Sequence, residues 1–249
     1  MRRVATLLLL CTFAQPGLGA DAGVLVETMK QARLSEGFEA RMEAATVAAN
    51  GRRATPFKLS VVGQIGAERQ RLRIRGISPD KVRGRYVAAE RNTDGHIRSI
   101  QYGEAASGSV EKSDPAARLF DSGLVLWDMF GAWWNWPQQS IEGSDRVDGR
   151  ACTLVRSHTD DGASPVREVL SCVDRDAKLS LRTQLYDRRH ALLRTIAVKQ
   201  TIRKESGALA AKKLSITEAD RTATEVEVYS GDEHYLVNAD TFAALDSSK

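Results

Sequence analysis

Residue types that commonly perform acid–base chemistry or bind metals are sparse in this chain of 249 residues. Two short stretches, residues 187–190 (DRRH) and 232–234 (DEH), could supply metal ligands, but no second cluster at metal-binding spacing joins either of them. The signatures HExxH, GxSxG, P-loop and GxGxxG are absent from the sequence. The four histidines each lie beside an expected turn or strand end: His96, His158, His190 and His234. We therefore expect no enzyme activity, no catalytic residue, no metal and no cofactor.

Arginines alternate with other residues along one expected strand and recur shortly after it. They are Arg69, Arg71, Arg73, Arg75, Arg83 and Arg85. Because successive side chains of a strand point to opposite faces, this period gathers guanidinium groups on one face of a sheet. Such a patch could contact an anionic headgroup or an acidic partner, and the alternative is a solvated face balanced by Asp and Glu. A nucleic-acid partner is not expected, because the patch lacks interleaved aromatic residues for base stacking.

All four tryptophans lie within ten residues of one another in a chain that is only 6% aromatic. They are Trp127, Trp133, Trp134 and Trp136, and Met129 and Phe130 lie among them. Each large aromatic side chain buries roughly 150 to 250 Å² when it is packed. The cluster is therefore either a core element packed over a sheet or part of the lining of a cavity for an apolar ligand, and the sequence leaves both interpretations open.

The first twenty residues have the three parts of a secretory signal peptide: two arginines, an apolar run over residues 4–13, and small residues up to Ala20. We expect export, with a mature chain of residues 21–249 that is soluble and periplasmic. The net charge of +4 then falls by two, because the leader carries two arginines and no acidic residue. In an oxidising compartment a disulfide between Cys152 and Cys172 is favoured over two buried thiols.

The elements that would position these residues follow from hydrophobic periodicity. Residues 23–34 have helical spacing, and from residue 37 the period becomes two, which is typical of half-buried antiparallel strands. About eleven strands are expected, over residues 38–44, 57–61, 69–77, 82–89, 96–102, 152–157, 166–173, 179–186, 192–202, 209–217 and 224–229. Three Asp-Gly dipeptides indicate hairpin turns. Residues 114–137 break the period and suit helical or irregular structure over the sheet, and residues 240–245 suit a closing helical turn.

Several short motifs resemble the outer-membrane lipoprotein-sorting family, the LolA-like proteins. They are residues 74–79 (IRGISP) followed by 83–87 (RGRYV), residues 119–129 (LFDSGLVLWDM), and the ending at residues 240–245 (DTFAAL). The resemblance extends over most of the chain, from Ala22 to Leu245. It implies a mainly β fold, an unclosed antiparallel half-barrel with helices as a lid over the concave face, in one domain over residues 21–249. The tryptophan density and the cysteine pair match no motif of that family.

The resemblance also implies a function: a non-catalytic periplasmic carrier that binds lipoprotein acyl chains or other lipids, delivers them to the outer membrane and meets a membrane-bound donor or acceptor protein. We expect a monomer. The expected cavity and lid residues are Val24, Leu25, Met29, Phe38, Met42, Phe57, Leu59, Leu72, Ile74, Trp127, Met129, Phe130, Trp133, Trp134 and Trp136. The main alternative is a periplasmic sensor of the same fold that detects lipoproteins and binds a membrane partner. A third is a hydrolase with paired carboxylates, although no such pair stands out.

Overall fold

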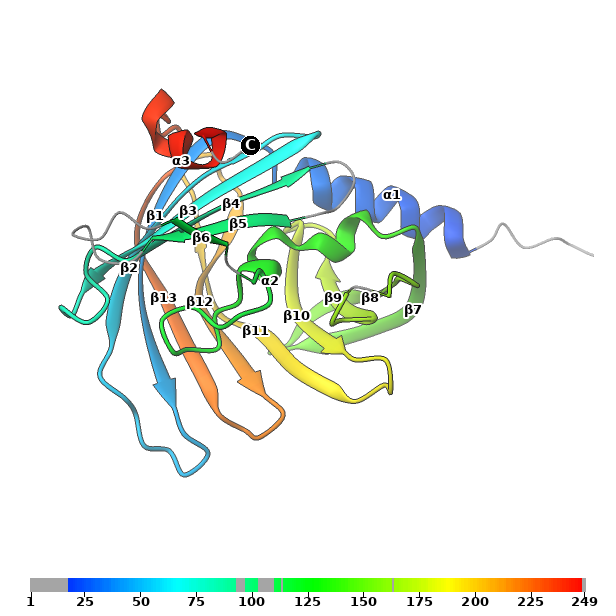
Figure 1. Ribbon diagram of the computed structural model, residues 1–249. Helices are drawn as coiled ribbons and strands as arrows, with labels where there is room; N and C mark the ends of the chain where they lie inside the picture. The colour runs from blue at the N-terminus through cyan, green and yellow to red at the C-terminus, as the bar shows by residue number, and fades with distance from the viewer. Residues whose placement is uncertain (1–17, 93–96, 103–109, 113, 163, 248–249) are drawn as a thin grey trace, which may run out of the picture.

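A computed structural model describes residues 18–92, 97–102, 110–112, 114–162 and 164–247. In this part of the chain, thirteen strands form one antiparallel sheet that curves strongly around its concave side (Figure 1). The strands are β1 (Ser35–Val47), β2 (Phe57–Ile65), β3 (Arg69–Ser78), β4 (Tyr86–Asn92), β5 (Ile97–Tyr102), β6 (Val110–Lys112), β7 (Gln138–Val147), β8 (Arg150–His158), β9 (Glu168–Asp174), β10 (Leu179–Tyr186), β11 (Leu192–Arg203), β12 (Leu209–Glu218) and β13 (Ala223–Asp232). As expected, the protein is mainly β structure, and its described strands form a sheet that does not close on itself.

The order of the strands explains where the sheet is open. It runs β6-β5-β4-β3-β2-β1-β13-β12-β11-β10-β9-β8-β7, so every pairing except one joins strands that are consecutive in sequence. The exception is the pairing of β1 with β13, which joins the two ends of the chain in the middle of the sheet. The free edges among the described strands are therefore β6 and β7. These two strands are consecutive in sequence, and the segment between them lies over the concave side (Figure 1).

Five helical segments accompany the sheet. They are α1 (Leu18–Gln31), α2 (Leu126–Phe130), a 3-10 turn η1 (Ala132–Asn135), a second 3-10 turn η2 (Ala239–Phe242) and α3 (Ala243–Ser247). α1 packs beside β7 and η1, whereas η2 and α3 pack on the opposite face of the sheet, against β3, β4 and β5. The buried stripe of α1 is Ala22, Leu25, Val26 and Met29, which is the spacing of one helix face. No helix among the described residues is long and apolar enough to cross a membrane.

The alternation of side chains on the strands divides apolar from polar residues. On β3, Leu72 and Ile74 point to the concave side and are buried, whereas the arginines between them point to the convex side. Register shifts such as the one between Arg41 and Met42 in β1 add local bends. The buried apolar residues of the strands thus gather on the concave face in two main clusters.

Some expected boundaries were wrong. Residues 82–85 form a turn, in which Val82 and Arg83 donate backbone hydrogen bonds to Pro79, and β4 begins only at Tyr86. α1 begins at Leu18 and ends at Gln31, earlier than the expected 23–34. The strands β6 and β7 were not expected at all. Residues 1–17 of the expected leader and His96 lie outside the described residues.

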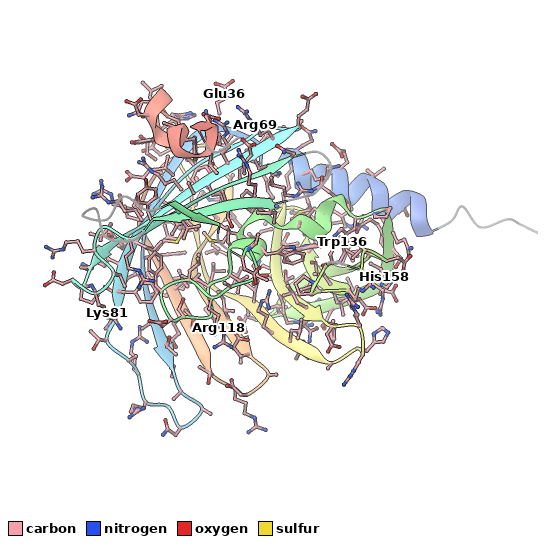
Figure 2. All side chains as sticks on the ribbon, viewed as in Figure 1. Glu36, Arg69, Lys81, Arg118, Trp136 and His158 are labelled. Atoms are coloured by element: carbon pink, nitrogen blue, oxygen red, sulfur yellow. A yellow bond between two sulfur atoms is a disulfide. The ribbon has the colours of Figure 1, made fainter. Side chains whose placement is uncertain are left out.

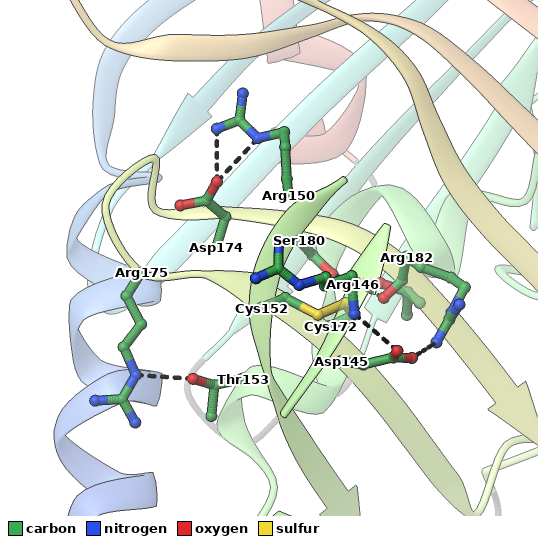
Figure 3. The surroundings of a disulfide bond; sticks show 11 residues. Asp145, Arg146, Arg150, Cys152, Thr153, Cys172, Asp174, Arg175, Ser180 and Arg182 are labelled. Carbon is green, nitrogen blue, oxygen red and sulfur yellow. Dashed lines mark hydrogen bonds and ion pairs between the residues drawn. A yellow bond between two sulfur atoms is a disulfide. The ribbon is translucent and has the colours of Figure 1, made fainter. Parts of the chain in front are cut away.

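The expected disulfide is present between Cys152 of β8 and Cys172 of β9 (Figure 3). Both cysteines are buried beside Leu181 in a small apolar cluster. Arg150 donates two hydrogen bonds to Asp174 Oδ2, at 3.0 and 2.5 Å, on the same pair of strands. The bridge therefore reinforces a hairpin that is already held by its ladder and by an ion pair, which is a structural role.

Candidate ligand-binding site

The residues between β6 and β7 form what we call the covering segment, residues 114–137. Its central part is α2, which begins after Val125 and ends at Gly131, a residue in the left-handed conformation (φ 56°) whose N–H donates to the carbonyl oxygen of Asp128 at 3.0 Å. Glycine suits this position because of its positive φ, and a Cβ here would also require the end of the Arg33 side chain to shift. η1 follows directly and carries Trp133 and Trp134.

One side of the covering segment packs on the first half of the sheet. Phe130 is almost fully buried among residues of β2, β3 and β4, and Leu126 and Met129 join the same cluster. The expected floor residues are all in this cluster: Phe57, Leu59, Leu72 and Ile74 are buried, and Phe38 and Met42 are partly buried against it. The structure therefore brings the expected floor and this part of the expected lid together.

The tryptophans pack on the second half of the sheet, over β8, β9 and β10. The ring of Trp127 lies 5.7 Å from that of Trp133 and 5.9 Å from that of Trp136, and the rings of Trp133 and Trp134 are 6.2 Å apart. Three of the four are buried, and Trp136 is partly buried near the β7–β9 end of the sheet (Figure 2). Rings at these separations are in favourable tilted contact. In this structure the tryptophan cluster covers the concave side over β8, β9 and β10.

α1 contributes two of its three expected lid residues. Leu25 and Met29 are buried in the tryptophan cluster. Val24 is not part of it, because its side chain is 70% exposed on the outer side of the helix. The inward position is taken by Val26, which lies two residues further on and therefore on nearly the opposite side of the helix.

Polar tethers hold the covering segment in place. Asp128 of α2 accepts hydrogen bonds from Arg194 Nη2 at 2.5 Å and Nε at 2.6 Å, a two-point contact with β11. Arg33, just after α1, donates to the carbonyl oxygen of Met129 at 3.1 Å. Gln139 of β7 donates to the carbonyl oxygens of Trp133 and Trp136, at 2.9 and 3.0 Å. Each tether joins the segment to a different element.

The charged tethers lie in a poorly solvated environment. Burial opposes the charge on Arg194, but the hydrogen bonds and charge of Asp128 outweigh it and raise the pKa of Arg194. Burial, and then the positive charge of nearby Arg91, lower the pKa of Arg33 to about 10. Both side chains remain cationic at neutral pH. Their charges are thus held close to an apolar cluster.

The floor is covered in this structure, because Phe57, Leu59, Leu72 and Ile74 are each at most 5% exposed. Two pockets of the described residues have volumes of about 140 and 200 Å³ and are lined largely by polar side chains. Neither is an apolar tunnel. An acyl chain could therefore reach the floor only if the covering segment moved away from it.

The expected arginine patch is divided by the structure. Arg71 is buried under α3, where it donates to Glu90 Oε2 at 2.7 Å and Asp246 Oδ1 at 2.6 Å, and Arg73 donates to the carbonyl oxygen of Thr241. Arg69 and Arg75 are exposed on the same convex face, and Arg69 lies at the same end of the sheet as α3 (Figure 2). Much of this face is covered by the C-terminal residues.

Two arginines are not part of this face. Arg83 lies in the turn before β4 and pairs with Asp80 at 3.0 Å. Arg85 lies over the ring of Phe120 at 5.8 Å, on the concave side. The expectation of one common face was wrong for these two, because the chain turns between Pro79 and Tyr86 and the two-residue period does not continue through a turn.

The histidines do not form a metal site in the described part of the chain, where no group of three or more potential ligands is found. His158 and His190 line the pocket of about 200 Å³. They pair with separate carboxylates, His158 with Asp160 at 3.2 Å and His190 with Glu168 at 3.7 Å. His234 is exposed.

Sequence reasoning missed the tethers Asp128, Arg194 and Arg33. A signal for Asp128 was present, since it is the only charged residue between Val125 and Trp136. A buried charge needs a partner, so an acidic residue inside an aromatic run indicates an ion pair. The partner could not be identified from the sequence, because Arg194 is one of many arginines on strands.

Comparisons with known proteins come from structure alone, since no family model and no curated protein sequence matches this chain. A DUF1329 family protein from Desulfovibrio piger is similar, with a TM-score of 0.81, 15% identity and coverage of 93% of this chain and 99% of that one. A putative outer membrane lipoprotein-sorting protein domain from Vibrio parahaemolyticus has a TM-score of 0.80, 15% identity and coverage of 92% and 100%.

A LolA superfamily protein from Nitrosomonas europaea is also similar, with a TM-score of 0.69, 13% identity and coverage of 89% of this chain and 96% of that one. Identities at this level carry information on architecture and not on individual side chains. The matches nevertheless extend over nearly the full length of all three solved chains. The protein therefore has the fold of LolA superfamily and outer membrane lipoprotein-sorting domain structures.

Proposed function

We propose that this protein is a periplasmic carrier that binds the acyl chains of lipoproteins or other lipids on the concave face of its sheet and delivers them towards the outer membrane. The observation that carries the proposal is that the apolar floor and the segment that covers it belong to different parts of the fold. The apolar floor belongs to the sheet, whereas Phe130 and the tryptophans that cover it belong to one connecting segment outside the ladder. Moving that segment would expose the floor without breaking a strand pairing.

The energetics fit an exchange of one apolar cover for another. Each methylene that moves from water to an apolar site contributes roughly 0.8 kcal/mol, so a long acyl chain can replace the contacts of several aromatic side chains. In the absence of a ligand, the covering segment keeps the apolar floor away from water. This role needs no covalent chemistry and no cofactor.

Export of the chain is part of the proposal. The leader-like first twenty residues, the disulfide between Cys152 and Cys172, and the similarity in fold to an outer membrane lipoprotein-sorting domain support a periplasmic location. Cleavage after Ala20 would remove the first three residues of α1 and leave its buried stripe from Ala22 to Met29 intact. A membrane-bound donor or acceptor would then load or unload a monomeric carrier of one domain.

The proposal is tested by expressing the full chain with export to a periplasm and recording native mass spectra together with lipid extracts. We expect a co-purifying acyl lipid, and saturable uptake of a fluorescent fatty acid by delipidated protein. The matched pair of variants is Phe130→Ala, which opens the concave side, and Phe242→Ala, which removes an equally buried ring on the convex side. Fatty-acid uptake should change in the first variant only. Absence of both bound lipid and uptake would contradict the carrier function.

A further inference from the structure

A small polar pocket lies where α1, η1 and the turn between β2 and β3 meet. Its volume is about 140 Å³, which is room for a carboxylate or phosphate group with some water. Its polar lining includes Lys30, Arg33, Gln70 and Asn135, and buried Trp134 forms one side. The pocket is therefore polar but borders directly on the aromatic cluster.

Arg33 is a cation without an acidic partner. Its guanidinium donates to the carbonyl oxygen of Met129, and among the described residues no carboxylate pairs with it. Arg91, which is buried, lies close enough to repel the charge of the partly buried Arg33. A guanidinium group has five N–H donors, so most of those on Arg33 are not used by protein acceptors. A cation beside an apolar cluster whose donors are not all used by the protein, as for Arg33, is stabilised when an anion lies next to it.

The amides of the lining can support an anion. When its oxygen faces Arg91, the Asn135 amide accepts from Nη1 and Nη2 at 3.0 and 3.1 Å, which turns its NH2 group away from that arginine. The buried Oε1 of Gln70 has no hydrogen-bond partner. Rotation of this amide by half a turn would present two N–H donors instead, at no cost in lost hydrogen bonds at Oε1.

The acidic residue of the lining is already neutralised. Glu27 pairs with Lys30 at 2.8 Å and accepts a hydrogen bond from Gln31 at 2.8 Å. The backbone carbonyls at the end of α1 are also occupied, because Ala32, Arg33 and Leu34 donate to Thr28, Lys30 and Gln31. Negative groups near the pocket are thus engaged, whereas the positive charge of Arg33 is not.

We propose that this pocket binds an oxyanion, a carboxylate or a phosphate, through Arg33, with Gln70 and Asn135 as amide donors. Such a group could be a free anion or the charged end of an amphiphile whose chain enters beside Trp134. The second source rests on the proposed carrier function, and the first does not. In either case Arg33 links the ligand to the covering segment, because the same guanidinium donates to Met129.

The test uses three probes with the full exported protein at constant ionic strength: inorganic phosphate, dodecyl phosphate and uncharged dodecanol. Binding is read from tryptophan fluorescence, since Trp134 lines the pocket, and from calorimetry. The variants are Arg33→Gln, which removes the charge, and Gln70→Glu, which supplies an internal carboxylate and leaves the contact of Arg33 with Met129 available. The control is Arg83→Gln, in the exposed turn before β4, where Asp80 is the one ion-pair partner of Arg83 in the described part of the chain.

We expect dodecyl phosphate to bind about tenfold or more weakly to Arg33→Gln and to Gln70→Glu than to the wild type and to Arg83→Gln. Saturable binding of inorganic phosphate with the same dependence would identify a site for the free anion. If these two variants weaken the binding of dodecyl phosphate but not that of inorganic phosphate, the site is one for the headgroup of an amphiphile. Anion binding that is equal in all four proteins would overturn the proposal. Dodecanol reports on the apolar site separately, so its failure to bind would count against the carrier function alone.

Discussion

Asp128 and Arg194 form a two-point ion pair that connects α2 to β11 across the concave side of the sheet. The two contacts are 2.5 and 2.6 Å long, and both side chains are largely buried. The pair joins two oppositely charged, largely buried side chains of the covering segment and the sheet. It therefore offers a way to loosen the cover without changing any apolar residue.

Replacing Asp128 by Asn should release the covering segment. The change leaves the largely buried Arg194 cation with the charge of Glu218 alone, and loss of one partner of a buried pair typically costs about 3 to 5 kcal/mol. We expect faster amide hydrogen exchange in α2 and η1, with the exchange of β2 unchanged, and a lower unfolding midpoint. The double variant Asp128→Asn/Arg194→Met should recover much of the stability. Equal protection of α2 in Asp128→Asn and wild type would show that the pair does not hold the cover.

Phe130→Ala should lower the free energy of unfolding and tighten the binding of a ligand. Removal of a buried phenyl ring typically lowers the free energy of unfolding by about 3 to 5 kcal/mol and leaves a cavity. That cavity would lie against the floor of β2 and β3, where we propose that acyl chains bind. We expect tighter binding of a fluorescent fatty acid, measured by titration. Phe242→Ala should be similarly destabilised but bind as the wild type does.

Removal of the disulfide should affect stability alone. The variant Cys152→Ala/Cys172→Ala opens a loop with a sequence separation of 20, for which the chain-entropy model gives a loss of about 3 kcal/mol. The cysteines lie in a cluster apart from the covering segment. Fatty-acid titrations of the oxidised protein and the variant should therefore agree below the unfolding temperature. A large change in affinity would mean that the β8–β9 hairpin takes part in binding.

Asp174 should contribute to stability in a pH-dependent way. Burial alone would raise its pKa, but hydrogen bonds from the Ala177 backbone and from Arg150 outweigh burial and lower it below 3.8. Its stabilising effect is then complete above the unfolded-state pKa and is lost as the pH falls through the lower folded-state value. Urea unfolding of the wild type and Asp174→Asn should differ by a constant amount above about pH 5 and converge below about pH 4. A gap that persists undiminished at pH 3 would contradict this.

Arg71 should prove to be a structural residue. Its replacement by Met leaves Glu90 buried, with only Arg69 and Arg98 at 3.7 Å, so we expect a loss of about 3 kcal/mol. Asp246→Asn removes the half-exposed partner and should cost no more than about 1 kcal/mol. Thermal unfolding of the two variants checks the order. Equal effects would mean that the contact with α3, rather than the burial of Glu90, gives Arg71 its importance.

The alternation of apolar and polar residues predicted most of the strands, because a half-buried strand has a two-residue period in its sequence. On β3 the alternation of Arg71, Leu72 and Arg73 correctly separated the two faces. β7 was missed because Ile141 and Val147 are its only large apolar residues, so an exposed edge strand shows no two-residue period. The short β6 has too few residues to show any period.

Tertiary contacts set the limit of the prediction for the site. Helical spacing in α1 was recognised, but it is compatible with either Val24 or Val26 facing inward, and only packing against the tryptophans decides between them. The burial of Arg71 depends on α3, which lies far away in sequence. Whether the tryptophans fill or line the concave side likewise depends on the position of α2 relative to the floor, which no local pattern contains.

The location of the covering segment between β6 and β7 has a mechanical consequence. The two free edges of the sheet are joined by covalent chain and not by a hydrogen-bonded ladder. The covering segment thus spans from one edge of the sheet to the other, and its two ends continue into β6 and β7. Displacement of the covering segment would act on both edge strands, and a change in the distance between β6 and β7 would loosen or tighten the segment. A ligand that pushes β6 and β7 apart would therefore displace the covering segment from the floor, with every strand pairing left intact.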